Sequence, residues 1–324
     1  MIASQRGNEL YLLERNSKEQ KPKRVNDEDS VQVIRSLYGE PTYRSVLNAL
    51  SDYSSTAVLS YLVECTVSPQ AIQRGAGDPQ IQQLAMWIQG YAQKSSSKLL
   101  TFVDIGAGNG DLLDAICASG CGHQIMYIPV EPNERYWESI QMRMRQTANL
   151  EFQDVRKTAK DVKDADVVFL VNVLHELDLH TRVELISQSL GLTYDRGVVV
   201  IHEVANLPIG EADFVMWSGE DLRTIFENAK MQIYITSART KSRPGGWPIE
   251  TICIKALEPP PESNRLLKGA ILSLPGILKR WTDELALNPM SDIRKELRDR
   301  IKAFRMAQVA NLSVWNQKYG ALKV

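Results

Sequence analysis

The sequence predicts an α/β protein built on a doubly wound, mostly parallel sheet of seven strands, with helical additions at both ends of the chain. Between about residues 99 and 201, short apolar runs alternate with segments long enough for helices. This alternation is typical of a parallel sheet that is covered on both faces. Two later runs, 232–237 and 250–256, are separated by a loop containing Pro244-Gly245-Gly246. Because that loop is too short for a crossover helix, the last pair is expected to be an antiparallel hairpin.

The remaining strands of the sheet are expected where the chain is most uniformly apolar. Four such runs span residues 99–105, 125–130, 167–171 and 198–201. Runs of this length without a polar face indicate strands buried on both sides.

The flanking segments differ in composition from this central domain, which we place at residues 98–257. Residues 1–26 are polar with a basic stretch at 21–24, and are predicted to be a flexible basic arm, with a short strand as the alternative. Residues 27–97 are predicted to be an N-terminal helical cap. The clearest helix of this cap begins at Asp78-Pro79. The apolar residues Ile81, Leu84, Ala85 and Ile88 follow at the spacing i, i+3, i+4 and i+7, which places them on one face of that helix.

A proline-rich linker at 258–262 ends the central domain, and residues 263–324 are predicted to be a C-terminal helical segment. One helix in this segment carries a set of basic residues: Arg294, Lys295, Arg298, Arg300, Lys302 and Arg305. Acidic residues at helical spacing accompany them, which favours a solvated, ion-paired face. A docking surface for RNA or for an acidic protein is the alternative.

Composition places the chain among ordinary globular proteins. The formal net charge of -1 gives no global attraction to nucleic acid or to an anionic membrane. No apolar run reaches the roughly 18 residues that a bilayer span needs, and the start of the chain has no signal-peptide core. The four cysteines are scattered, without a complete local set of metal ligands. We therefore expect a cytoplasmic protein with no membrane association, no disulfide framework and no bound metal.

The strongest motif is a glycine-rich turn that follows a buried strand. The strand 102–105 runs into Gly106-Ala107-Gly108-Asn109-Gly110, and a helix follows from about residue 112. Glycines allow a tight turn and a close approach by a ligand, and the helix N-terminus offers free N–H groups to an anion. The spacing is Gly-x-Gly-x-Gly, whereas a dinucleotide fingerprint requires Gly-x-Gly-x-x-Gly. No Walker lysine follows, which argues against ATP binding.

Acidic residues flank this turn at two strand ends. Asp104 precedes the first glycine by two positions, and Glu131 ends the next strand. A carboxylate at that strand end can accept hydrogen bonds from both hydroxyls of a ribose.

Together these residues resemble class I methyltransferases that use S-adenosylmethionine (SAM), with a Rossmann-like domain over roughly residues 99–257. The resemblance implies that SAM is the cofactor. It places the amino-acid end of SAM near Asp104 and the glycine turn, and the ribose at Glu131. It also implies a further short strand near segment 152–155, which brings the sheet to seven strands, with the adenine at Asp154. The implied cofactor-binding residues are Asp104, Gly106, Ala107, Gly108, Gly110, Glu131, Pro132, Asp154, Val155 and Asn172. Binding of a nicotinamide dinucleotide is the main alternative.

Catalytic candidates follow from the position of the substrate in such a sheet, at the carboxyl ends of the strands. Methyl transfer to an acidic nucleophile needs a base. His175 and Glu203 are the candidates, with His202 as the neighbour of Glu203. Adjacent residues on a strand point to opposite faces, so only one of His202 and Glu203 can serve the site. A structural role for each is the competing interpretation.

The leading functional hypothesis is methyl transfer to a small-molecule acceptor, with the helical additions covering the pocket or forming a homodimer interface. An RNA or protein methyltransferase that docks through the basic C-terminal helix is the second. A SAM-binding sensor or scaffold that does not methylate is a third, because no single residue is compelled to act as a base.

Overall fold

The computed structural model describes residues 2–6, 9–13, 23–24, 28, 32, 77–95, 99–162, 164–204, 215–240, 249–259, 262–287 and 295–321. The chain divides into two compact units. One comprises residues 1–70, 206–215 and 274–323, and the other comprises residues 71–205 and 216–273. The second of these units holds the large sheet.

A seven-stranded sheet is the frame of this unit, with the strand order β6-β5-β4-β7-β8-β10-β9. The strands are β4 (Leu100–Ile105), β5 (Ile125–Val130), β6 (Glu151–Phe152), β7 (Val167–Val171), β8 (Val198–Val204), β9 (Ile233–Arg239) and β10 (Ile249–Ala256). Only β10 runs antiparallel to its neighbours β8 and β9, and the other pairs are parallel. The predicted fold class is therefore confirmed, including the antiparallel final hairpin.

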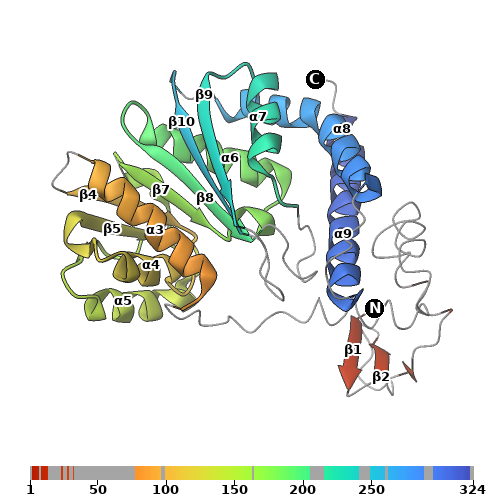
Figure 1. The fold of residues 1–324 in the computed structure, drawn as a ribbon, viewed down its shortest axis with the longest axis horizontal. Helices are drawn as coiled ribbons and strands as arrows, with labels where there is room; N and C mark the ends of the chain where they lie inside the picture. The colour runs from red at the N-terminus through yellow and green to blue at the C-terminus, as the bar shows by residue number, and fades with distance from the viewer. Residues whose placement is uncertain are drawn as a thin grey trace. The chain divides into compact units, whose positions relative to one another are not determined.

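Helices cover both faces of this sheet (Figure 1). They are α3 (Pro79–Lys94), α4 (Asp111–Ser119), α5 (Trp137–Gln146), α6 (Leu179–Thr193) and α7 (Gly219–Asn228). Short 3-10 turns lie between them: η1 (Gly122–Gln124), η2 (Glu134–Tyr136), η3 (Ala159–Asp161) and η4 (Leu174–Glu176). One apolar core joins α3, α4 and α5 to Phe102, Tyr127 and Phe169 on the sheet. Residues that alternate with these, such as Val168, point to the other face.

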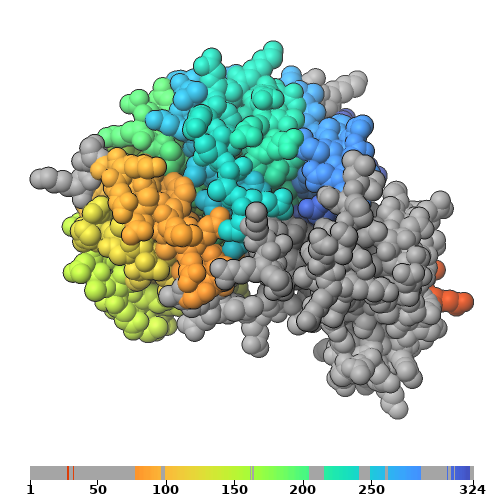
Figure 2. Space-filling model, in the orientation of Figure 1, coloured from red at the N-terminus to blue at the C-terminus, as the bar shows by residue number. Residues whose placement is uncertain are grey.

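The helix α3 packs directly on the sheet, so it belongs to the same unit as the strands. Its predicted apolar face is buried, and Asp78 caps its N-terminus by accepting a hydrogen bond from Gln80 N. Trp87 Nε1 donates to Cys253 Sγ at 3.0 Å, and Tyr91 O–H donates to the carbonyl of Asp166 at 3.3 Å. Side chains of α3 form part of the near surface in Figure 2, in orange. The helix is therefore the outer layer over this face.

The other unit contains a small antiparallel sheet, β1 (Ile2–Arg6), β2 (Glu9–Leu13) and β3 (Lys23–Arg24). These strands lie within the segment that we predicted to be an arm, and the apolar run Leu10-Tyr11-Leu12-Leu13 accounts for β2 through its high strand propensity. Helix α8 (Ser263–Leu287) enters this unit at Leu274, and α9 (Lys295–Gly320) lies wholly within it. Arg305 pairs with Glu284 at 3.8 Å.

Most of the predicted N-terminal cap, from residue 33 to 76, lies outside the described residues, as does Arg294 of the basic set. In the part of the chain that the structure describes, no helix is both long and apolar enough to cross a membrane.

Candidate active site

The glycine turn joins β4 to α4 at the carboxyl edge of the sheet. Gly106, Gly108 and Gly110 have φ angles of +75°, +50° and +84°. Residues that carry a Cβ rarely adopt such angles. Gly110 is also the N-cap of α4. A Cβ on Gly106 would lie 2.6 Å from Cγ2 of Val173, so glycine lets the turn pack against the segment that follows β7. The predicted glycines therefore meet both a backbone and a space requirement.

Glu131 lies at the end of β5 and its carboxylate faces this turn. Oε2 accepts a hydrogen bond from Gly108 N at 2.8 Å, and Oε1 accepts one from Asn133 N at 2.7 Å. The backbone carbonyl of Glu131 accepts a hydrogen bond from Trp137 Nε1 at 2.7 Å. The carboxylate is thus oriented by backbone N–H groups while each oxygen keeps a further lone pair for another donor.

Asp104 is buried beside the turn, and its carboxylate accepts a hydrogen bond from the Tyr127 hydroxyl at 2.6 Å. Burial raises the pKa of Asp104 to about 7. The bond from Tyr127 lowers this pKa in part, and the carboxylates of Asp111 and Glu131 raise it. Burial and the nearby Asp104 also raise the pKa of Tyr127 well above its usual value, so the phenol remains the donor.

Asn172 follows β7 at the same edge, in the left-handed backbone conformation with φ of 54°. Its backbone N–H donates to the carbonyl of His202 at 2.9 Å. Its side-chain Nδ2 donates to Oε1 of Gln80, at the start of α3, at 3.2 Å. The first turn of α3 therefore meets the carboxyl end of β7 beside the glycine turn.

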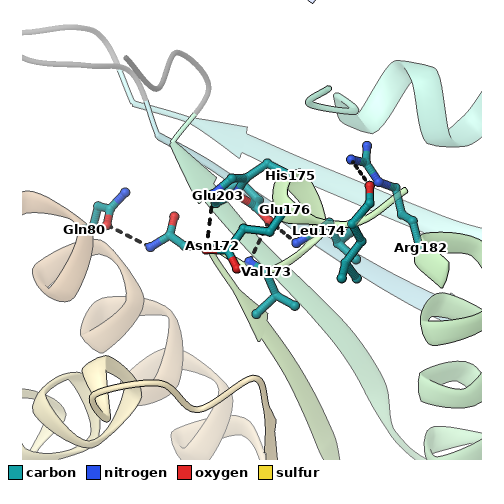
Figure 3. Close-up of polar contacts among 9 residues, drawn as sticks. Gln80, Asn172, Val173, Leu174, His175, Glu176, Arg182 and Glu203 are labelled. Atoms are coloured by element: carbon teal, nitrogen blue, oxygen red, sulfur yellow. Dashed lines mark hydrogen bonds and ion pairs between the residues drawn. The ribbon is translucent and has the colours of Figure 1, made fainter. Parts of the chain in front are cut away.

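The two catalytic candidates contact each other (Figure 3). His175 Nδ1 lies 2.6 Å from Oε2 of Glu203, and both side chains are buried. The other carboxylate oxygen of Glu203 accepts hydrogen bonds from the backbone N–H groups of Val173, at 3.1 Å, and Leu174, at 2.9 Å. His175 Nε2 lies 4.0 Å from Oε1 of Glu176, whose side chain is exposed. Through these contacts Glu203 on β8 connects to the segment that follows β7, which carries Val173, Leu174 and His175.

His202 points to the opposite face of β8, as the alternation of the strand requires. Its Nδ1 lies 2.9 Å from the hydroxyl of Thr251, which also accepts a hydrogen bond from Gln83 Nε2 at 2.9 Å. His202 is therefore part of a polar chain under α3 and is separate from the pair formed by His175 and Glu203.

The predicted residues for the adenine end lie near β6. Val155 is buried, whereas Asp154 is exposed, as is Pro132 after β5. Arg156 continues the strand by bridging to Val130. Ala107 is buried within the glycine turn. The candidate cofactor residues thus share one edge of the sheet, and Asp154 and Pro132 lie at its exposed margin.

Four residues that sequence reasoning did not select support the site. Tyr127 donates a hydrogen bond to Asp104, and Gln80 accepts one from Asn172. Trp137 donates a hydrogen bond to the backbone carbonyl of Glu131. Arg143 of α5 donates to the carbonyl of Asn109 in the turn and pairs with Asp114 of α4. No local pattern marks Arg143, because its partners are distant in sequence. Tyr127 lies three residues before the end of β5, and this position near the strand end was its only sequence signal.

The sheet has the strand order β6-β5-β4-β7-β8-β10-β9, and β10 runs antiparallel between β8 and β9. This topology is that of the class I methyltransferase fold. No protein-family profile matches the chain, and no curated protein sequence matches it.

Solved structures of methyltransferases are similar to the chain at low identity. Magnesium protoporphyrin IX methyltransferase from Synechocystis PCC 6803, crystallised with SAM, is 14% identical over 70% of this chain and 98% of its own, with a TM-score of 0.42. The mitomycin 7-O-methyltransferase MmcR is 15% identical over 72% and 73%, with a TM-score of 0.43. The tRNA m1G37 methyltransferase of M. jannaschii is 14% identical over 55% and 48%, with a TM-score of 0.38. The acceptors named for these proteins include small molecules and tRNA.

Proposed function

We propose that the protein is a SAM-dependent methyltransferase that acts on a small-molecule acceptor. The observation that carries the proposal is the contact between the glycine turn and Glu131, whose carboxylate accepts a hydrogen bond from Gly108 N. Three glycines in left-handed conformations form the turn at the carboxyl edge of a class I methyltransferase sheet, and an oriented carboxylate faces it. Ligands of open α/β sheets bind at this edge.

The chemistry of these residues fits SAM. Each oxygen of Glu131 has one backbone donor and one remaining lone pair, which suits the two hydroxyls of a ribose. The N-terminus of α4 after Gly110 suits the carboxylate of the methionine end. Asp104, when ionised, would attract its ammonium group. Bound SAM would supply an electrophilic methyl group on a sulfonium.

A small acceptor is favoured by two buried polar atoms where the start of α3 meets the end of β7. Gln80 Nε2 and Asn172 Oδ1 are both buried from solvent although they lie at the edge where the acceptor would bind. Polar atoms that are buried in this way suit a small molecule that can be enclosed, because enclosure excludes water from the reacting groups.

In this proposal His175 is the general base and Glu203 is its positioning residue. The carboxylate of Glu203 holds Nδ1 of His175, which in the neutral ring leaves Nε2 as the proton acceptor. The same carboxylate fixes the backbone at Val173 and Leu174, so it also sets where the ring stands.

Calorimetric titration with SAM and with S-adenosylhomocysteine tests the cofactor. We expect both to bind the wild type, and Glu131→Gln to weaken binding by about tenfold to a hundredfold, the scale of a hydrogen bond to a charged group. Glu134→Gln, three residues further in an exposed ion pair with Lys157, is the matched control and is expected to bind like the wild type.

The two outcomes have different meanings. If folded wild-type protein binds neither compound, the proposed function is wrong, and nicotinamide dinucleotides are the next ligands to titrate. If both compounds bind, transfer of a labelled methyl group to pools of small molecules and to RNA decides the acceptor class. Transfer to RNA alone would overturn the small-molecule part of the proposal.

A further inference from the structure

Two side-chain amides at the carboxyl edge of the sheet bond to each other and leave polar atoms unused. Asn172 Nδ2 donates to Gln80 Oε1 at 3.2 Å. The remaining polar atoms, Gln80 Nε2 and Asn172 Oδ1, are buried and have no hydrogen-bond partner in the described part of the chain. The Gln80 side chain belongs to a residue that is only 5% exposed. Because buried polar groups are nearly always paired, these two atoms are available to hydrogen-bond a bound molecule.

The two unused atoms form a set with a defined pattern. In Figure 3 the amide nitrogen of Gln80 and the carbonyl oxygen of Asn172 point to the same side of the bond that joins the two residues. They present one donor beside one acceptor. Exchanging oxygen and nitrogen in both amides preserves the bond and only swaps which residue is the donor. The donor–acceptor pattern therefore does not depend on how the amides are assigned.

The complementary ligand group is neutral and has its own acceptor beside its own donor. Neither amide carries a charge, and burying a carboxylate or an ammonium against them would leave that charge uncompensated. A carboxamide, a lactam, or the equivalent edge of a nitrogen heterocycle has the required pair of atoms.

The position of the pair identifies which ligand it serves. Asn172 is the residue before Val173, which packs against Gly106 of the turn. The pair therefore borders the edge where the methyl donor would lie, and it is away from β6, where the adenine end is expected. We propose that Gln80 and Asn172 recognise a neutral amide-type edge of the methyl acceptor, which gives Asn172 a role toward the acceptor in place of the cofactor contact that the family resemblance implies. This inference rests on the proposed function, because it assigns the ligand to the acceptor.

Benzamide and benzamidine are the probes that test this pattern. They have the same ring, but benzamide offers one acceptor and N–H donors, whereas benzamidine is a cation with donors only. We expect saturation-transfer NMR on the protein saturated with S-adenosylhomocysteine to show benzamide binding at least about tenfold tighter than benzamidine, the scale of one lost hydrogen bond with an unpaired partner.

Gln80→Glu converts the donor of the pair into an acceptor and adds a negative charge. Asn172 Nδ2 can still donate to one carboxylate oxygen, so two acceptors then face the ligand, and the preference should reverse in favour of benzamidine. Gln82→Glu is the matched control, because it adds the same charge to the same helix at an exposed position. It is expected to keep the wild-type preference for benzamide.

Equal binding of both probes, no benzamide binding, or a reversal in Gln82→Glu as well as in Gln80→Glu would each overturn the inference. The calorimetric titration with S-adenosylhomocysteine separates this result from the proposed function. Cofactor binding without a benzamide preference overturns the amide recognition alone, whereas loss of cofactor binding overturns the proposed function.

Discussion

Glu203 binds both the ring of His175 and the backbone that carries it. One carboxylate oxygen lies 2.6 Å from His175 Nδ1, and the other accepts from the N–H groups of Val173 and Leu174. All of these contacts join β8 to the segment after β7, about thirty residues earlier in the chain. The same residue can thus stabilise the fold and orient a base, and separate variants distinguish the two roles.

Glu203→Ala is expected to lower the free energy of unfolding by about 3 kcal/mol or more, because it leaves the partners of a buried carboxylate unpaired. Denaturant unfolding measures this change. Glu184→Ala, at an exposed position on α6, is the control and is expected to change stability by no more than about 0.5 kcal/mol. Equal stability of Glu203→Ala and the wild type would contradict the structural role.

His175→Asn is expected to lower kcat by about a hundredfold to ten-thousandfold, the range for a positioned acid or base. The Asn amide can keep a donor to Glu203 but has no counterpart of Nε2, so stability and cofactor affinity should change little. Initial rates of labelled methyl transfer across pH, with an acceptor found by the screen, measure the effect. An unchanged kcat would show that His175 is not the base.

Asp104 is expected to make the protein less stable as pH rises from about 4 to about 7. An unfolded Asp loses its proton near pH 3.8, whereas burial raises the pKa of folded Asp104 to about 7. Between these values the folded chain holds the additional proton, so the free energy of unfolding falls as pH rises and levels off above 7. Full linkage of one proton corresponds to about 1.4 kcal/mol per pH unit.

Asp104→Asn removes the ionisation and keeps an oxygen for the Tyr127 hydroxyl. We expect this variant to lose that contribution to the pH dependence and to be more stable than the wild type above pH 7. Denaturant unfolding at several pH values measures the difference between the two curves. Asp154→Asn, at an exposed position, is the control, and identical slopes for wild type and Asp104→Asn would refute the assignment.

Arg143→Met is expected to weaken binding of S-adenosylhomocysteine by about tenfold, because it removes the side chain that ties the glycine turn to α5 and α4. The Met side chain retains the apolar part of the Arg stem. Calorimetry measures the affinity, and hydrogen exchange of the turn is expected to be faster. Arg145→Met removes an exposed charge two residues further on and should have no effect on either measurement.

Gly106→Ala is expected to destabilise the fold by about 1–3 kcal/mol, because φ is positive and the new Cβ would meet Val173 at 2.6 Å. Gly90→Ala is the matched control in the interior of α3, where nothing beyond the helix's own neighbouring backbone lies within 4 Å of the added Cβ. That control should stabilise the protein by about 0.5–1 kcal/mol. Thermal unfolding of both variants measures the contrast, and stabilisation by both would mean that the turn tolerates a side chain.

The amino-acid sequence alone was sufficient to predict the sheet and the glycine turn. Strands 125–130 and 167–171 lie where their apolar runs begin and end, because a strand buried on both faces has no polar positions. The positions of Gly106, Gly108 and Gly110 also followed from the sequence, since their conformations are local requirements of the backbone. Alternation along β8 separated His202 from Glu203 without any tertiary information.

The partners of these residues depended on the tertiary structure. Gln80 meets Asn172, and Arg143 meets Asn109, across 92 and 34 residues of sequence. The spacing of apolar residues along the sequence does not predict such contacts. They depend on how the helices lie across the sheet, whereas the spacing reflects the repeat within one helix or strand. The pairing of His175 with Glu203 has the same origin, since parallel packing of β7 against β8 brings two distant strand ends together. The sequence therefore determined which residues reach the site's edge, and only the packing of α3, α5 and β8 decided what each one binds.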